Sequence, residues 1–203
     1  MKITKPKSYS DFTLDHLQEI FGIKTQYEEF SLQAQPFAVP DWLPELFDAT
    51  KGLPNATEKA KSEFYITPIL TAFFQANNHK FQYFSGYTFD VDKQKALRGR
   101  CDYLLTKSQT LNIDVPVFAI FEAKDDSLNH WYGQCGAEMY AAQLFNAKKG
   151  KPIHIIYGAV SNGLTWQFLR LTDLLLEVDT RLYTIENHEV LLGTLQTIIN
   201  FYD

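Results

Sequence analysis

The feature that most constrains this chain is an apolar run, "VPVFAIFEAK", at residues 115–124, interrupted only by a glutamate and a lysine near its end. Side chains of a strand alternate between two faces. Here both faces are apolar, so the run predicts an interior strand whose sheet is covered on both sides. Alternation puts Glu122 and Lys124 on one face, together with Phe118 and Ile120. The pair either lies at the rim of the sheet without a chemical role or belongs to a reactive site.

Composition places the chain among ordinary globular proteins, since 45% of its 203 residues are apolar and 21% are charged. We expect a single domain spanning residues 1–203. No apolar stretch is long enough to cross a membrane, and no apolar segment of a secretory signal follows the N-terminal lysines. Because Cys101 and Cys135 do not make a disulfide framework, a cytoplasmic location is expected.

The net charge of −5 counts against a broad nucleic-acid-binding surface. Two small basic groups interrupt the acidic background. We interpret them first as solvated ends of structural elements, and the alternative is a local rim that contacts nucleic acid. The groups consist of Lys93, Lys95, Arg98 and Arg100, and of Lys148, Lys149 and Lys151.

Periodicity and turn residues divide the chain into helices and strands. Three sequential strands joined by short turns predict an antiparallel meander, and a helix leading into a further buried strand predicts a parallel crossover. The sequence therefore predicts an α/β fold with a central mixed sheet flanked by helices. The expected helices are 8–22, 42–49, 56–78 (kinked at Pro68), 128–147 and 186–202, and the expected strands are 24–32, 81–91, 96–106, 115–124, 152–160, 164–171 and 175–185.

Asp102, in "RGRCDYLL", lies on the strand that precedes Glu122, with nineteen residues between the two acids. A meander can therefore bring the two carboxylates together. Buried carboxylates repel each other unless a cation or a proton offsets their charge, and Mg²⁺ typically binds one or two protein carboxylates plus water and phosphate. The ammonium of Lys124 would then orient a water molecule and stabilise negative charge on a phosphate.

Glu63 supplies a third acid on the helix expected at 56–78. It falls on the same three–four stripe as Ile66 and Leu70, so it is expected to face the sheet. An inward charge is costly unless it is paired, and Glu63 is therefore expected to meet Lys124 or a metal-bound water. The alternative is a partly exposed helix glutamate that belongs to no site.

The ordered segments "SEFYITPIL", "CDYLL", "IFEAK", "GQCGAEMYAAQL" and "SNGLTWQFLRL" resemble the PD-(D/E)XK nuclease superfamily, most closely the nuclease domains of type I restriction enzyme motor subunits. The resemblance covers a nuclease-like core at residues 57–172. An N-terminal extension at 1–56 and a C-terminal strand and helix at 173–203 lie outside it. The resemblance implies a restriction-endonuclease-like fold and Mg²⁺-dependent hydrolysis of DNA phosphodiester bonds, with Mn²⁺ as a substitute, in a restriction- or defence-related role.

The same resemblance implies roles for individual residues. Asp102 and Glu122 would bind the metal. Lys124 would act on the water nucleophile or on the transition state, and Glu63 would be a supporting acid. Gln134 is expected to be a polar group at the edge of the site.

Two positions depart from the pattern of the superfamily. Cys101 stands where the signature has proline, and Glu138 stands four residues after Gln134, where the exonuclease branch has tyrosine. Glu138 lies on the inward stripe of its helix. Its partner is left open between Lys124, a metal-bound water and a backbone donor.

Three hypotheses follow from these observations. The first is a metal-dependent deoxyribonuclease, with endonuclease and exonuclease action both open, working alone, as a homodimer or with a separate recognition or motor subunit. The second is a catalytically inactive module of the nuclease fold that binds nucleic acid or a protein partner, which better explains the acidic net charge. The third is an unrelated α/β protein with a coincidental Glu-x-Lys. The first is favoured because the acids and the lysine arrive in order on suitable elements.

Overall fold

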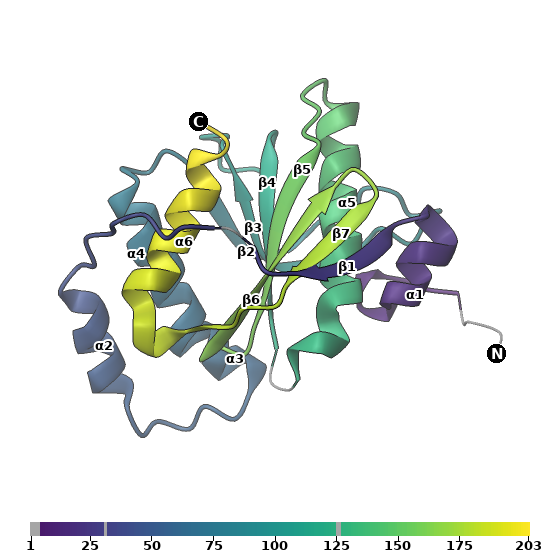
Figure 1. Ribbon diagram of the computed structural model, residues 1–203. Coiled ribbons are helices and arrows are strands. Elements are labelled where there is room, and N and C mark those ends of the chain that lie inside the picture. The colour runs from purple at the N-terminus through teal and green to yellow at the C-terminus, as the bar shows by residue number, and fades with distance from the viewer. Residues whose placement is uncertain (1–4, 31, 125–126) are drawn as a thin grey trace.

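The computed structural model describes residues 5–30, 32–124 and 127–203, and it is an α/β structure built on one mixed sheet (Figure 1). The strands are β1 (Lys24–Glu28), β2 (Gln82–Thr88), β3 (Arg100–Thr106), β4 (Val117–Ala123), β5 (Ile155–Ser161), β6 (Thr165–Thr172), β7 (Leu175–Asp179) and β8 (Tyr183–Thr184). Their order across the sheet is β1–β7–β6–β5–β4–β3–β2, and β8 pairs with β6. The expected α/β class is confirmed.

Helices cover both faces of the sheet. They are α1 (Leu14–His16), α2 (Trp42–Thr50), α3 (Glu58–Lys61), α4 (Thr67–Ala76), α5 (Tyr132–Lys148) and α6 (His188–Asn200). Figure 1 shows α1 and α5 on one side, and α2, α4 and α6 on the other. Each side buries its own apolar core, so the sheet is enclosed as the sequence predicts.

The centre of the sheet has the predicted connections. The pairs β2–β3 and β3–β4 are antiparallel, and β4 pairs with β5 in parallel after the crossover through α5. Every residue of β4 is buried. The apolar run is therefore the interior strand that its composition predicts.

The predicted alternation of side chains is wrong at the start of β4, where Val117 and Phe118 lie on the opposite faces from those expected. Leu105 pairs with Ala119 and Thr106 pairs with Val117, so Phe118 is an extra, unpaired residue in a β-bulge. Phe118 consequently packs on the side of α6, whereas Ile120 packs on the side of α5. Strict alternation resumes after the bulge, which is why Glu122 still points towards α5.

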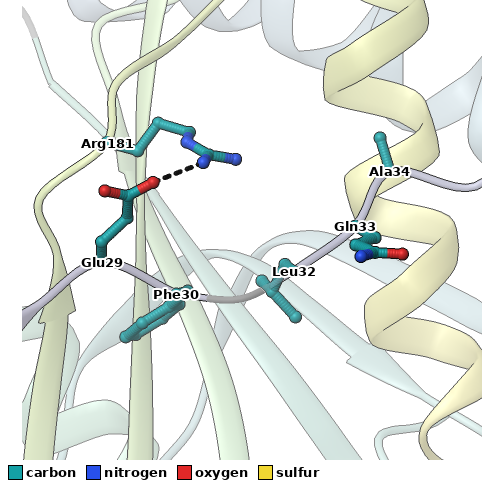
Figure 2. A pocket seen from close by; sticks show the side chains of 6 residues that line it. All are labelled: Glu29, Phe30, Leu32, Gln33, Ala34 and Arg181. Atoms are coloured by element: carbon teal, nitrogen blue, oxygen red, sulfur yellow. Dashed lines mark hydrogen bonds and ion pairs between the residues drawn. The ribbon is translucent and has the colours of Figure 1, made fainter.

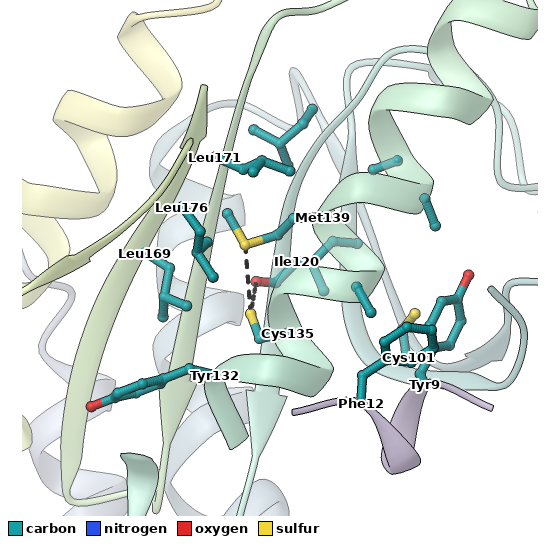
Figure 3. Close-up of a cluster of buried hydrophobic side chains, with 14 of the residues drawn as sticks. Tyr9, Phe12, Cys101, Ile120, Tyr132, Cys135, Met139, Leu169, Leu171 and Leu176 are labelled. Carbon is teal, nitrogen blue, oxygen red and sulfur yellow. Dashed lines mark hydrogen bonds between the residues drawn. The ribbon is translucent and has the colours of Figure 1, made fainter. Parts of the chain in front are cut away.

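Helix α5 lies unusually close to its neighbours because of small residues. A Cβ atom added to Gly136 would lie 2.6 Å from the side chain of Leu17, and one added to Gly158 would lie 2.6 Å from Sδ of Met139. Figure 3 shows Sγ of Cys135 on the sheet-facing side of this helix, where it contacts Sδ of Met139 and the carbonyl of Ile120. Cys135 is fully buried, as expected for a core residue. This close packing holds the sheet-facing side of α5 against the end of β4.

The segments before residue 57 and after residue 172 complete the sheet and its cover. The early strand β1 pairs in parallel with β7, although more than a hundred residues of chain separate them. The last helix, α6, packs in the core opposite α5. No helix within the described residues is both long and apolar enough to span a membrane.

Candidate active site

Asp102 and Glu122 meet where the β3–β4 ladder ends. The last regular pair is Tyr103 with Phe121, which places Asp102 opposite Glu122 on the same face. The amide of Asp102 donates to Oε1 of Glu122 at 3.4 Å, and the amide of Ala123 donates to Oδ2 of Asp102 at 2.8 Å. Each carboxylate thus accepts a hydrogen bond from an amide of the neighbouring strand. These two bonds fix both carboxylates at this edge.

Lys124 joins the two acids. Its Nζ lies 3.0 Å from Oε2 of Glu122 and 3.8 Å from Oδ2 of Asp102. The same ammonium lies 4.6 Å from the centre of the Trp131 ring, within the range of a cation–π contact. The structure therefore brings together the two acids and the lysine that the sequence singles out.

The acids keep Lys124 charged. Burial alone would lower the pKa of this lysine, but the carboxylates of Glu122 and Asp102 outweigh burial and raise it. A buried ammonium held in its charged form can donate hydrogen bonds to an anion. It also offsets part of the negative charge collected at this edge.

Gln134 and Glu138 extend the cluster from α5. Nε2 of Gln134 donates to Oε2 of Glu122 at 2.6 Å and to Oε1 of Glu138 at 3.1 Å. Gln134 is buried, so it lies inside the site rather than at its edge. The partners of Glu138, which the sequence left open, are Gln134 and the carboxyl of Glu122.

Two acids packed together away from water cannot both be fully ionised at low cost. Burial raises the pKa of Glu138 to about 7. Burial, and then the nearby Glu138 and Asp102, raise the pKa of Glu122 well above its ordinary value. Within the described chain, Oε2 of Glu138 and Oε1 of Gln134 are buried without a hydrogen-bond donor. The cluster therefore holds more acceptors than donors.

Glu63 does not reach this cluster, so its expected inward position is wrong. Its side chain is 57% exposed and forms an ion pair with Lys59 at 3.7 Å. The reason is a π-helical turn at Ser62–Ile66, in which the amide of Thr67 reaches back to the carbonyl of Ser62. One extra residue in this turn rotates Glu63 away from the buried stripe.

The π-helical turn also explains how the helix accommodates Pro68. Pro68 lies in the first turn of α4, where a missing amide breaks no helical hydrogen bond. The expected long helix is continuous from Glu58 to Ala76, and α3, the π-helical turn and α4 follow one another in it without a break.

Two residues near Lys124 carry a role that the sequence did not reveal. Glu58, in the first turn of α3, contributes to raising the pKa of Lys124, after the larger effects of burial, Glu122 and Asp102. The sequence feature that could have placed Glu58 is Thr57. The side chain of Thr57 accepts the amide of Ala60, so it caps α3 and the helix begins at Glu58. Trp131, expected to be a core or interface aromatic, lies beneath the ammonium.

Another hollow lies in a different part of the molecule. It has a volume of about 690 Å³ and lies beside the ends of β1 and β7. Figure 2 shows its charged residues, Glu29 and Arg181, paired with each other. Their charges are already balanced, and the hollow lies away from the acids of β3 and β4 in the strand order.

Comparison with known proteins adds no relative to this picture. No protein-family model matches the sequence, and no curated protein matches it either. An assignment of chemistry therefore depends on the geometry of the site itself.

The oxygen-rich cluster suits a hard divalent cation. Asp102 and Glu122 offer two carboxylates at one edge, and Mg²⁺ commonly uses one or two such ligands. Orphaned oxygens on Gln134 and Glu138 show a local need for positive charge or protons. No group of three or more His, Cys, Asp or Glu side chains is arranged for metal binding in the described ranges, so water and phosphate would complete the coordination.

Proposed function

We propose that this protein is a Mg²⁺-dependent nuclease of the PD-(D/E)XK type that hydrolyses DNA phosphodiester bonds. The observation that carries the proposal is the meeting of Asp102, Glu122 and Lys124, which joins two acids on adjacent strands to one ammonium. The meander β2–β3–β4 and the crossover through α5 to β5 also follow the order of elements in the restriction-endonuclease-like fold.

The roles follow from charge and position. Asp102 and Glu122 would hold Mg²⁺, which supplies Lewis-acid polarisation of a phosphate oxygen and a more acidic water. Lys124 donates hydrogen bonds to the phosphate as negative charge builds on its oxygens, or orients the attacking water. Gln134 holds the carboxylate of Glu122 through the bond of 2.6 Å, so Gln134 is a positioning residue.

Nicking of supercoiled plasmid DNA tests the proposal. The wild-type protein should nick in Mg²⁺ or Mn²⁺ and stop when the metal is chelated, and Lys124→Ala should remove the activity. Lys148→Ala is the matched control, because Lys148 is exposed at the far end of α5. That end lies beside the start of β4, where Asn146 binds the backbone of Val117. Equal nicking by wild type and Lys124→Ala would refute the proposal.

One observation favours a second function, an inactive module that binds nucleic acid or a protein partner. Lys124 already lies between the two carboxylates and neutralises charge where a metal would bind. Calorimetric titration with Mn²⁺ separates the two functions. A nuclease should take up the metal with an affinity that Asp102→Asn weakens, whereas a module with a permanently paired lysine should take up none.

A further inference from the structure

A second hollow, of about 310 Å³, lies at the same edge of the sheet as the acidic cluster. Asn162, on its wall, directly follows β5, and Ser161 accepts the amide of Lys124 at 2.7 Å. The start of α5 separates the hollow from the cluster. Trp131 and Gln134 contact the cluster, whereas Tyr132 lines the hollow. The hollow and the cluster therefore lie on either side of the start of α5, at the ends of β4 and β5.

The lining of the hollow is neutral. None of the described residues that line it is an acid, a lysine, an arginine or a histidine, which makes it a poor place for a phosphate. The side chains of Leu128 and Leu182 and the ring of Tyr132 offer apolar surface. Amide and hydroxyl groups supply the rest. Apolar walls with a few fixed polar groups suit a flat, neutral, hydrogen-bonding ligand.

Two asparagine amides on the wall are held so that each keeps its NH₂ group as a donor. Oδ1 of Asn162 accepts the amides of Leu164 at 3.1 Å and Thr165 at 2.8 Å, which leaves its NH₂ group to donate. Oδ1 of Asn129 accepts the hydroxyl of Ser127 at 2.7 Å, which also leaves an NH₂ group. Two fixed donors on the wall of one hollow match a ligand edge with two acceptors.

We infer that this hollow, here called the base pocket, binds a guanine base next to the cleaved phosphate. Guanine presents two adjacent acceptors, N7 and O6, whereas adenine and cytosine present an amino donor and thymine presents a single acceptor beside its methyl group. The apolar surface of Leu128 and Leu182 packs against the base. This inference rests on the proposed nuclease function and adds a base preference to it.

Mapping of cut ends tests the inference. Plasmid DNA of mixed sequence is nicked by the wild type in Mg²⁺, and the ends are sequenced. We expect guanine to be enriched about fivefold or more at one fixed position beside the cut, since a good pair of base contacts discriminates by about 1–3 kcal/mol.

Asn162→Asp is the decisive variant. It keeps an oxygen for the amides of Leu164 and Thr165 but replaces the NH₂ donor with an acceptor, so the guanine enrichment should disappear among the nicks that the variant still makes. Asn129→Asp should weaken the enrichment in the same way. Asn112→Asp is the control, because it adds the same charge on the exposed loop before β4, at the opposite edge.

The outcomes separate the two claims. Nicking that depends on Lys124 but shows no guanine enrichment, or enrichment that survives in both Asn162→Asp and Asn129→Asp, overturns the base pocket and leaves the nuclease intact. Nicking that is unchanged in Lys124→Ala overturns the nuclease, and the base pocket fails with it.

Discussion

Two buried groups of acids in this molecule have opposite hydrogen-bonding states. The carboxylate of Asp179, at the end of β7, accepts the amides of Phe30 at 3.1 Å and Arg181 at 3.0 Å and the hydroxyl of Tyr183 at 3.0 Å. Both of its oxygens therefore have donors. Glu138 instead shares the amide donor of Gln134 with Glu122, and its Oε2 is buried without a donor.

The comparison shows that burial of an acid does not by itself identify a site. Asp179 is as inaccessible as Glu138, yet it ties together β1, β7 and β8 and completes the fold. Arg170 does the same for Glu177 through two bonds of 2.7 and 2.8 Å, and those bonds lower the pKa of Glu177. A shortage of donors, rather than burial, distinguishes the cluster around Glu122.

The largest expected effect is on cleavage, and it compares two equivalent substitutions. Asp102→Asn removes a carboxylate that we propose binds the metal but keeps an acceptor for the amide of Ala123, and we expect plasmid nicking to fall about 1,000-fold. Asp179→Asn should leave the rate within about threefold. Initial rates in Mg²⁺ measure both. Similar losses of nicking rate in the two variants would show that Asp102 and Asp179 do not differ in function.

The next effect is on stability, and here the larger loss is expected at Asp179 rather than at Asp102. Asp179→Ala leaves three donors without an acceptor, so the free energy of unfolding should fall by about 3 to 4 kcal/mol. Asp102→Ala, at a half-buried position, should cost about 1 kcal/mol. Urea denaturation provides both values. An equal cost at the two positions would show that the carboxylates have the same structural role.

A smaller effect concerns pH. Glu138 has a pKa of about 7 in the folded protein against 4.5 in an ordinary carboxyl, so the folded state binds more protons between these values. The resulting stabilisation is fully present below pH 4.5 and is lost as the pH rises through about 7. It amounts to at most about 3 kcal/mol.

Glu138→Gln should flatten this pH dependence, as measured by urea unfolding at pH 5 and pH 8. Glu189→Gln, the same substitution at an exposed acid of α6, is a suitable companion variant that should leave the wild-type slope in place. The interpretation fails if Glu138→Gln and the wild type lose the same stability over this range.

The smallest effects separate two acids of the α3 region. Glu63→Gln disrupts only an exposed ion pair, so stability should change by about 0.5 kcal/mol or less and nicking should be unchanged. Glu58→Gln should change the nicking rate by about twofold at most, because Glu58 is the smallest of the influences on the pKa of Lys124, and Glu122 and Asp102 keep the ammonium charged without it. A larger loss in Glu63→Gln than in Glu58→Gln would restore the original prediction for Glu63.

The sequence predicted the parts of the site that depend on strand ends. Glu122 and Lys124 end an apolar run, and Asp102 lies on the preceding strand, so a meander suffices to bring them together. Regular periodicity does not reveal single-residue insertions. The bulge at Phe118 and the π-helical turn at Ser62–Ile66 each add one residue, and the second of these misplaced Glu63.

Long-range pairings were less accessible to sequence analysis. The contact of Gln134 with Glu122 requires the exact seating of α5 on the sheet, which depends on close packing at Gly136 and Gly158. The parallel pairing of β1 with β7 depends on tertiary contacts between distant segments. Neither leaves a local pattern of residues.

The most direct test of the central claim is an anomalous-difference map from a crystal soaked in Mn²⁺. The account predicts a single strong peak within coordination distance of carboxylate oxygens of both Asp102 and Glu122, with Asp179 unchanged. A map without a peak at these two acids, from crystals that bind Mn²⁺ elsewhere, would contradict it.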